Sequence, residues 1–330
     1  MKKEVIQGKE IQRFTLTNAN KTKVVILSLG GIIQEFSIIN QGQRQNLVVN
    51  FDSAKEYVEN PYQICKQIGR VAGRIKNGCF ELNDKLVQVP VNEGTNTLHG
   101  GEHGVSSQVF DGYQVADNEV TLSLNLDPTV DGFPGDLTLQ INYFLTDEDR
   151  LNVTYDLVAK TDTVYDPTIH IYWALDQGLN DTTLNINGDE ITETTADKIP
   201  TGELQKVNGT AYDFTNDQNL AEAVTKLRNE EGLKGFDTAY KVQDSLKEPV
   251  AVVNEHNKCV KIKIFSDRNG LVIFTADPKN AANDEKGLFN SLATEVQTLP
   301  DSLHNGKFGN VRLTAGEHKR MQIAYQIEKY

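Results

Sequence analysis

The sequence predicts an all-β protein with large antiparallel sheets, because apolar and polar residues alternate with a period of two in many separate segments. Such alternation places apolar side chains on one face of a strand and polar side chains on the other. It is typical of antiparallel sheets with one buried face. The clearest segments are 120–126, 137–143, 151–157, 260–264 and 321–327. Turn sequences between such segments support two large packed sheets, a β-sandwich.

Helical periodicity is confined to short stretches of the chain. Between residues 217 and 230, four apolar residues follow the spacing of one helix face. They are Leu220, Ala223, Val224 and Leu227. A second, shorter helix is expected over residues 53–58. Because we find no internal repeat, low-complexity tract or linker, we expect a single domain over residues 1–330.

The composition limits the classes of partner that the protein can bind. The chain has 330 residues and a formal net charge of −13, and we find no basic run that could neutralise phosphates. This argues against binding to nucleic acid. The longest apolar stretch, residues 24–33, is interrupted by Ser28, Gly30 and Gly31. It is far shorter than the ~20 residues that span a bilayer, so we expect no membrane partner.

Cysteine usage bears on the cellular compartment. The three cysteines, Cys65, Cys79 and Cys259, form no CxxC pair. The first ten residues turn polar too early to contain the apolar core of a secretory signal. An odd number of cysteines without such a signal suggests reduced thiols. We therefore expect a cytoplasmic protein.

The segment from Gly69 to Gly101 concentrates residues that could hold a polar ligand. Arg70 and Arg74 lie four positions apart among small residues, and arginine offers a rigid fork of hydrogen-bond donors. His99 follows a strand-like stretch and precedes two glycines that allow the chain to turn. An equally simple interpretation is a structural arginine pair beside a histidine in a hairpin.

The sequence contains no motif that predicts a metal or cofactor site. His99 and His103 form an HxxxH pattern, but that spacing needs a helix to bring both rings to one face. Gly100 and Gly101 lie inside the pattern, so we expect no metal. A GxSxG elbow and a phosphate-binding glycine loop are both missing from the sequence, and we expect no cofactor.

Three further residues are candidates for acid–base chemistry. His170 is the odd member of the apolar, aromatic strand in the stretch 166–175, where it is either a core histidine or a proton donor. Glu295 either faces solvent on an alternating strand or serves as a general base. Asp237 could cap a turn or hold hydroxyl groups. Carboxylates and arginines around a histidine suggest a neutral polyhydroxylated substrate such as a sugar.

Together these stretches resemble the aldose 1-epimerase (galactose mutarotase) family over nearly the whole chain. The motifs that carry the resemblance, in chain order, are GRVAGRIKNG, NTLHGG, DGFPGDL, PTIHIYWAL, IPTGE, GFD and TEVQTLPDS. The resemblance implies a large β-sandwich of the galactose mutarotase-like supersandwich type. It also implies cofactor-independent interconversion of the α and β anomers of free aldoses.

The resemblance implies specific roles for six residues. Glu295 corresponds to the general base at the anomeric hydroxyl, and His170 to the general acid at the ring oxygen. The positions that correspond to substrate-binding residues are Gly73, Arg74, His99 and Asp237. Arg70 is expected to support Arg74 rather than to contact substrate.

The chain departs from the family pattern beside these positions. Gly73 replaces a frequent asparagine, Ile169 precedes His170, and Thr238 follows Asp237 where a histidine is common. Trp173 either stacks on a sugar or fills the core, and we expect the core. These departures lie around the pocket, so they bear on substrate preference rather than on reaction type.

Four alternatives concern the substrate and the activity itself. The substrate could be galactose or glucose, the reducing end of a disaccharide such as maltose, or a hexose 6-phosphate held by Arg70, Lys66 or Lys76. The chain could also be a non-catalytic sugar-binding module, since fold does not imply function. In each case the expected partner is a small-molecule sugar, and the protein is expected to be a monomer or a homodimer.

Overall fold

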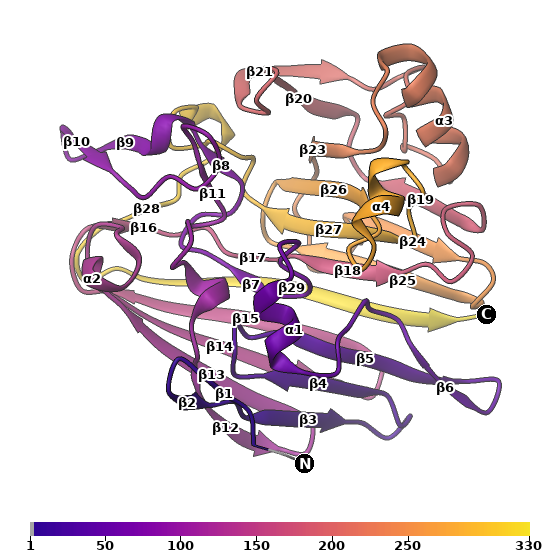
Figure 1. Ribbon diagram of the computed structural model, residues 1–330, viewed down its shortest axis with the longest axis horizontal. Coiled ribbons are helices and arrows are strands. Elements are labelled where there is room, and N and C mark those ends of the chain that lie inside the picture. Colours follow the sequence, from indigo (N-terminus) through magenta and orange to yellow (C-terminus); the bar gives the residue numbers. More distant parts are fainter. Residues whose placement is uncertain (1–2) are drawn as a thin grey trace.

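The computed structural model describes residues 3–330 and confirms the all-β prediction (Figure 1). Its largest sheet has nine antiparallel strands and contains all five segments in which alternation is clearest. In sheet order the strands are β12 (Asp111–Ala116), β13 (Glu119–Leu126), β14 (Leu137–Leu145), β15 (Arg150–Ala159), β29 (His318–Lys329), β25 (Val260–Ser266), β24 (Ala251–Glu255), β19 (Thr182–Ile186) and β22 (Gln218–Asn219).

A second large sheet has six strands and carries Glu295 and Asp237. In order they are β18 (Ile171–Ala174), β27 (Ser291–Gln297), β26 (Gly270–Ala276), β23 (Asp237–Lys241), β20 (Glu190–Thr194) and β21 (Pro200–Lys206). A third sheet near the N-terminus joins β3 (Arg13–Thr17), β4 (Lys23–Leu27), β5 (Ile33–Asn40) and β6 (Gln43–Asn46). The prediction of two large sheets is thus confirmed, with this smaller sheet added.

Five two-stranded ribbons complete the β-structure. They pair β1 (Val5–Ile6) with β2 (Lys9–Glu10), β7 (Gln67–Ile68) with β17 (Thr168–Ile169), β8 (Arg74–Ile75) with β11 (Thr97–Leu98), β9 (Cys79–Leu82) with β10 (Lys85–Gln88), and β16 (Thr163–Val164) with β28 (Arg312–Leu313). The short 3₁₀ turns are η1 (Lys76–Gly78), η2 (Val105–Ser107) and η3 (Gly306–Phe308).

Both predicted helices are present, with ends close to the expected ones. Helix α3 (Leu220–Glu231) buries the four apolar residues named above and is capped by the Asn219 side chain. Helix α1 (Ala54–Glu59) begins after Ser53, whose hydroxyl accepts from the Glu56 N–H in a capping box. The sequence analysis did not identify α2 (Pro128–Asp131) or α4 (Ala281–Glu285). Within residues 3–330, no helix is both long enough and apolar enough to cross a membrane.

The main hydrophobic core runs from Ile11 to Ile327 and takes side chains from all three sheets. Trp173 lies in this core, fully buried, and its indole N–H donates to the Thr294 hydroxyl at 2.9 Å. The prediction that Trp173 fills the core is therefore confirmed. The prediction of one domain over residues 1–330 stays a prediction.

A smaller core supports the segment from Gly69 to Gly101. Its members are Val71, Ile75, Phe80, Leu82, Val89, Phe133, Val164, Leu303 and Val311. In Figure 1 this segment, with β8 to β11, forms a lobe beside the six-stranded sheet. The lobe brings Arg74 and His99 together, because Leu98 pairs with Arg74 at the end of β11 and the next residue, His99, donates its N–H to the Gly73 carbonyl at 2.9 Å.

Arg70 is completely buried in this lobe and forms an ion pair with Asp131. Its Nε lies 2.7 Å from Oδ2 of Asp131, and its Nη2 lies 3.1 Å from Oδ1. Its Nη1 donates to the carbonyls of Pro134 and Gly135 and to the Thr163 hydroxyl. Helix α2 ends at Asp131, and the next residue, Gly132, adopts the left-handed conformation. Arg70 thus ties the lobe to the loop after α2.

We predict that Arg70→Met destabilises the protein by about 3–5 kcal/mol, because it leaves the buried Asp131 carboxylate without its charged partner. Thermal unfolding of both proteins measures the loss. As a control, Lys307→Met removes an exposed ion pair with Glu203 and should change stability by less than about 1 kcal/mol. An Arg70→Met variant with the same melting temperature as the wild type would contradict the structural role of Arg70.

Candidate active site

One face of the six-stranded sheet forms the floor of a cavity of about 420 Å³. This volume lies within the range of about 300–1,000 Å³ that is usual for small-molecule sites. The residues that line it from this sheet are Tyr172, Thr192, Thr194, Pro200, Asp237, Ala239, Val272, Phe274, Glu295 and Gln297. The lobe supplies part of the wall through Gly73, Arg74, Asn92, Glu93, Leu98 and His99.

Glu295 lies on β27, with β18 on one side of that strand and β26 on the other. Only 3% of it is exposed, so the alternative that it faces solvent is wrong. Its neighbour on β26 is Val272, and both side chains line the cavity. A carboxyl group on a central strand is held more rigidly than one on a loop, which suits a group that must meet a fixed atom of a ligand.

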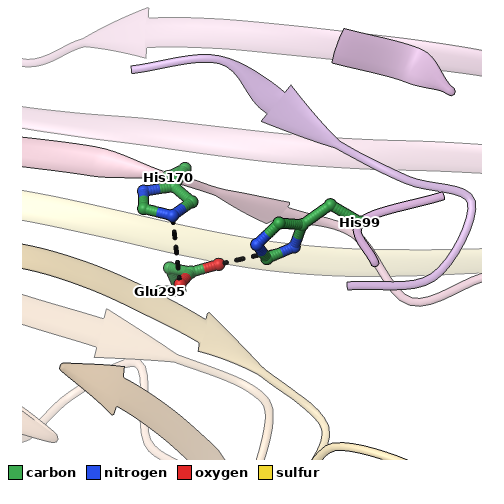
Figure 2. Close-up of side chains that lie close together, drawn as sticks. All are labelled: His99, His170 and Glu295. Carbon is green, nitrogen blue, oxygen red and sulfur yellow. Dashed lines mark ion pairs between the residues drawn. The ribbon is translucent and has the colours of Figure 1, made fainter. Parts of the chain in front are cut away.

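His170 lies between β17 and β18 and faces Glu295. Its Nε2 is 3.5 Å from Oε1 of Glu295. The ring stacks on Tyr172, with centroids 4.8 Å apart and planes 12° apart, and only 6% of the residue is exposed. Figure 2 shows the ring directed at the carboxyl group. The alternative of a core histidine without a ligand-facing role is not supported, because His170 lines the cavity.

His99 approaches the same carboxyl group from the lobe. Its Nδ1 is 3.9 Å from Oε2 of Glu295, so the two oxygens of the carboxyl group face different histidines (Figure 2). The Gly73 N–H donates to this Nδ1 at 3.3 Å, which leaves Nε2 to carry the proton of the neutral ring. The next residue, Gly100, must be glycine, because a Cβ there would lie 1.9 Å from the Gly69 carbonyl oxygen.

Burial shifts all three groups toward their neutral forms. It raises the pKa of Glu295 to about 8, and the nearby Asp237 carboxylate adds to this shift while Arg74 opposes it. Burial lowers the pKa of His170 to about 3. It also lowers the pKa of His99 well below its ordinary value. At neutral pH the free site therefore holds an uncharged carboxyl group between two neutral imidazoles.

Arg74 and Asp237 lie together on another side of the cavity. The Arg74 guanidinium binds Glu93 through Nε at 2.6 Å and Nη2 at 2.9 Å. Its Nη2 also lies 3.8 Å from Oδ2 of Asp237. The structure thus brings all six sequence-predicted residues to one cavity, which Gly73 lines next to Gln297 and Pro300. Arg70 does not line the cavity, and its bonds go to Asp131 and to the loop after α2.

The sequence analysis missed several residues that line the cavity. They are Tyr62, Gln63, Glu93, Lys198, Phe274 and Gln297. Glu93 carries no motif, and its role depends on the pairing of β8 with β11. Gln297 could have been predicted to line the site, because it follows Glu295 by two positions on a strand and so lies on the same face.

The same cluster has a geometry that could hold a metal ion. The ligating atoms of His99, His170 and Glu295 all lie within 4.8 Å of one another. His103, the other histidine of the HxxxH pattern, is exposed and does not belong to this cluster. The expectation of a metal-free protein stays a prediction.

Comparisons with known proteins agree with this geometry. A family model described as aldose 1-epimerase matches residues 12–326. The maltose epimerase of Levilactobacillus brevis is 37% identical, over 98% of this chain and 97% of its own length. An aldose 1-epimerase of Streptococcus thermophilus is 33% identical, over 97% of this chain and 95% of its own.

A solved structure extends the agreement to the fold. The aldose epimerase homologue from C. elegans superposes with a TM-score of 0.87 at 22% identity, covering 97% of this chain and 99% of its own. At 22% identity this similarity shows only that the two proteins share a fold. The family model and the sequence relatives go further, and they show that this chain belongs to the aldose 1-epimerase family of isomerases.

Proposed function

We propose that the protein interconverts the α and β anomers of free aldoses such as glucose and galactose, without a cofactor. The observation that carries this proposal is the buried Glu295 carboxyl group, whose two oxygens face His170 and His99 inside a sugar-sized cavity. A non-catalytic sugar-binding module would gain nothing from burying an acid against two imidazoles, because that burial costs stability.

In this mechanism Glu295 and His170 open and close the sugar ring. Glu295 accepts the proton of the anomeric hydroxyl while His170 donates a proton to the ring oxygen. The electrons of the O–H bond form the aldehyde C=O, and the C1–O5 bond breaks with its electrons moving to O5. Rotation about C1–C2 then presents the other face of the aldehyde, and both proton transfers run in reverse. Each such transfer is worth about 10²–10⁴-fold in rate.

The pKa shifts fit this mechanism if Glu295 and His170 share one proton. The reactive form needs a carboxylate beside an imidazolium, and this form differs from the neutral pair only in the position of one proton. Transfer from Glu295 to Nε2 of His170, 3.5 Å away, produces it without changing the net charge of the buried site. The buried site therefore reaches its reactive form without gaining or losing a proton.

Arg74, Asp237 and His99 are suited to holding the ring hydroxyls. Arg74 and Asp237 form charged hydrogen-bonding groups at the cavity wall. His99 can donate through Nε2, since its Nδ1 accepts from Gly73. Hydrogen bonds to charged groups are worth about 1.5–3 kcal/mol each, which is enough to fix the orientation of a neutral sugar.

A disaccharide with a free reducing end is a second candidate substrate. The 37% identical relative is named a maltose epimerase. The cavity adjoins a second hollow and shares four residues with it, namely Tyr62, Lys198, Asp237 and Phe274. A hexose 6-phosphate would need a cation beside its phosphate group; Arg70, Lys66 and Lys76 do not line the cavity, whereas Lys198 does.

The test of the function is proton NMR of freshly dissolved α-glucose, α-galactose and maltose with catalytic amounts of protein. We expect the α-anomer signal to decay toward equilibrium faster than in buffer, with or without chelator. Methyl α-glucoside is the control, since its anomeric oxygen carries no proton and it must remain unchanged. Release of methanol would indicate a glycosidase, and buffer-like decay for all three sugars would contradict the proposal.

We predict that Glu295→Gln loses at least about 100-fold in rate yet is more stable than the wild type. The folded protein holds the proton of Glu295 up to a pKa of about 8, whereas the unfolded chain releases it near 4.5. Wild-type stability therefore falls as pH rises from 4.5 to 8. Glutamine cannot ionise, so the difference in melting temperature between the variant and the wild type should widen across this range. An active Glu295→Gln variant would remove Glu295 from the mechanism.

A further inference from the structure

Gln297 is a completely buried residue of the cavity wall whose side chain has no assigned task. It lies on β27, two positions after Glu295, so both side chains project from the same face of the strand. None of it is exposed. Within residues 3–330, neither its amide nitrogen nor its amide oxygen has a hydrogen-bond partner.

An unpartnered buried amide is costly, so this one is expected to have a ligand. Leaving a buried donor or acceptor unpaired costs about 1–3 kcal/mol, and native proteins contain few such groups. The amide of Gln297 offers both an acceptor oxygen and a donor nitrogen. A sugar hydroxyl also donates and accepts, so it can satisfy this amide without bringing charge into the cavity.

We propose that Gln297 is a substrate-binding residue that recognises the hydroxyl on C2 of the sugar, the carbon next to the anomeric carbon. This inference rests on the proposed function, which places the anomeric hydroxyl at Glu295. The anomeric carbon has two ring neighbours, the ring oxygen and C2. His170 faces Oε1 of Glu295 and takes the ring-oxygen side. C2 and its hydroxyl then lie on the other side, where Oε2 faces His99.

Gly73 lies next to both Gln297 and His99, and so places Gln297 near the side of the site where His99 faces Oε2 of Glu295. Its N–H and C=O both bind His99, the first at Nδ1 and the second at the backbone N–H. A Cβ added at Gly73 would lie 3.1 Å from the Gln297 amide nitrogen. Gly73 therefore sits between His99 and Gln297, and its missing side chain leaves the amide open to the ligand. This gives the glycine at position 73 a function in substrate selection.

The test compares glucose with 2-deoxyglucose in Gln297→Met, which keeps the length of the side chain but removes both amide atoms. We expect the variant to lose about 3- to 10-fold in kcat/KM for glucose, the value of one or two neutral hydrogen bonds. The rate for 2-deoxyglucose should stay close to that of the wild type after subtraction of the spontaneous reaction. The variant should melt no lower than the wild type, because a buried unpaired amide has been removed.

A matched control is Gln140→Met, which makes the same change at an exposed position of β14 that does not line the cavity. It should preserve the ratio of glucose to 2-deoxyglucose rates.

If Gln297→Met does not fold, Gly73→Asn covers the amide instead and should lower the ratio of glucose to 2-deoxyglucose rates. Equal losses on both sugars, or no loss on either, would overturn the role of Gln297. A wild type without anomer interconversion would instead refute the proposed function, and calorimetric binding of the two sugars would still test the contact.

Discussion

The burial of one carboxyl group between two imidazoles is the constraint on which the rest of the site depends. Glu295 is 3% exposed and lies 3.5 Å from His170 and 3.9 Å from His99. Removing a carboxylate from water is costly unless it is neutralised or paired. Here the carboxyl group keeps its proton to a pKa of about 8. The same burial that destabilises the charge therefore keeps a transferable proton in the cavity.

This arrangement needs two rigid supports that approach each other from distant parts of the sequence. The six-stranded sheet fixes Glu295 on a central strand, and the lobe of residues 69–101 carries His99 and Arg74 on the β8–β11 ribbon. The Arg70–Asp131 pair anchors that lobe to the loop after α2. Neither Arg70 nor Asp131 lines the cavity, so this pair acts on the site only by holding the lobe in place. A small shift of the lobe would move His99 away from the carboxyl group.

Much of this structure could be predicted from the sequence. Strands such as 137–143 and 151–157 alternate strictly, because one face of the nine-stranded sheet is buried along its length. Helix α3 was found for the same reason, since its four buried residues repeat with helical spacing. The resemblance to one family then selected six residues, and all of them lie around one cavity.

The remainder depends on contacts that local sequence cannot encode. Glu93 binds Arg74 only because a hairpin brings residues 19 positions apart together. Helix α2 was not predicted, because its four residues are too few to show a period. Glu295 could not be assigned to the buried face, since every residue of β27 is buried and no alternation marks one side. Gln297 lacked a motif of its own, and its importance follows from an unpaired amide that only the structure reveals.

Burial lets Glu295 hold a proton at neutral pH in the sugar-free protein. Infrared difference spectroscopy of the wild type against Glu295→Gln measures this proton, because a protonated carboxyl group and a carboxylate absorb at different frequencies. We predict that the protonated band persists through neutrality and disappears with a midpoint near pH 8. A midpoint near 4.5, the ordinary value of a glutamate side chain, would contradict the shared-proton account.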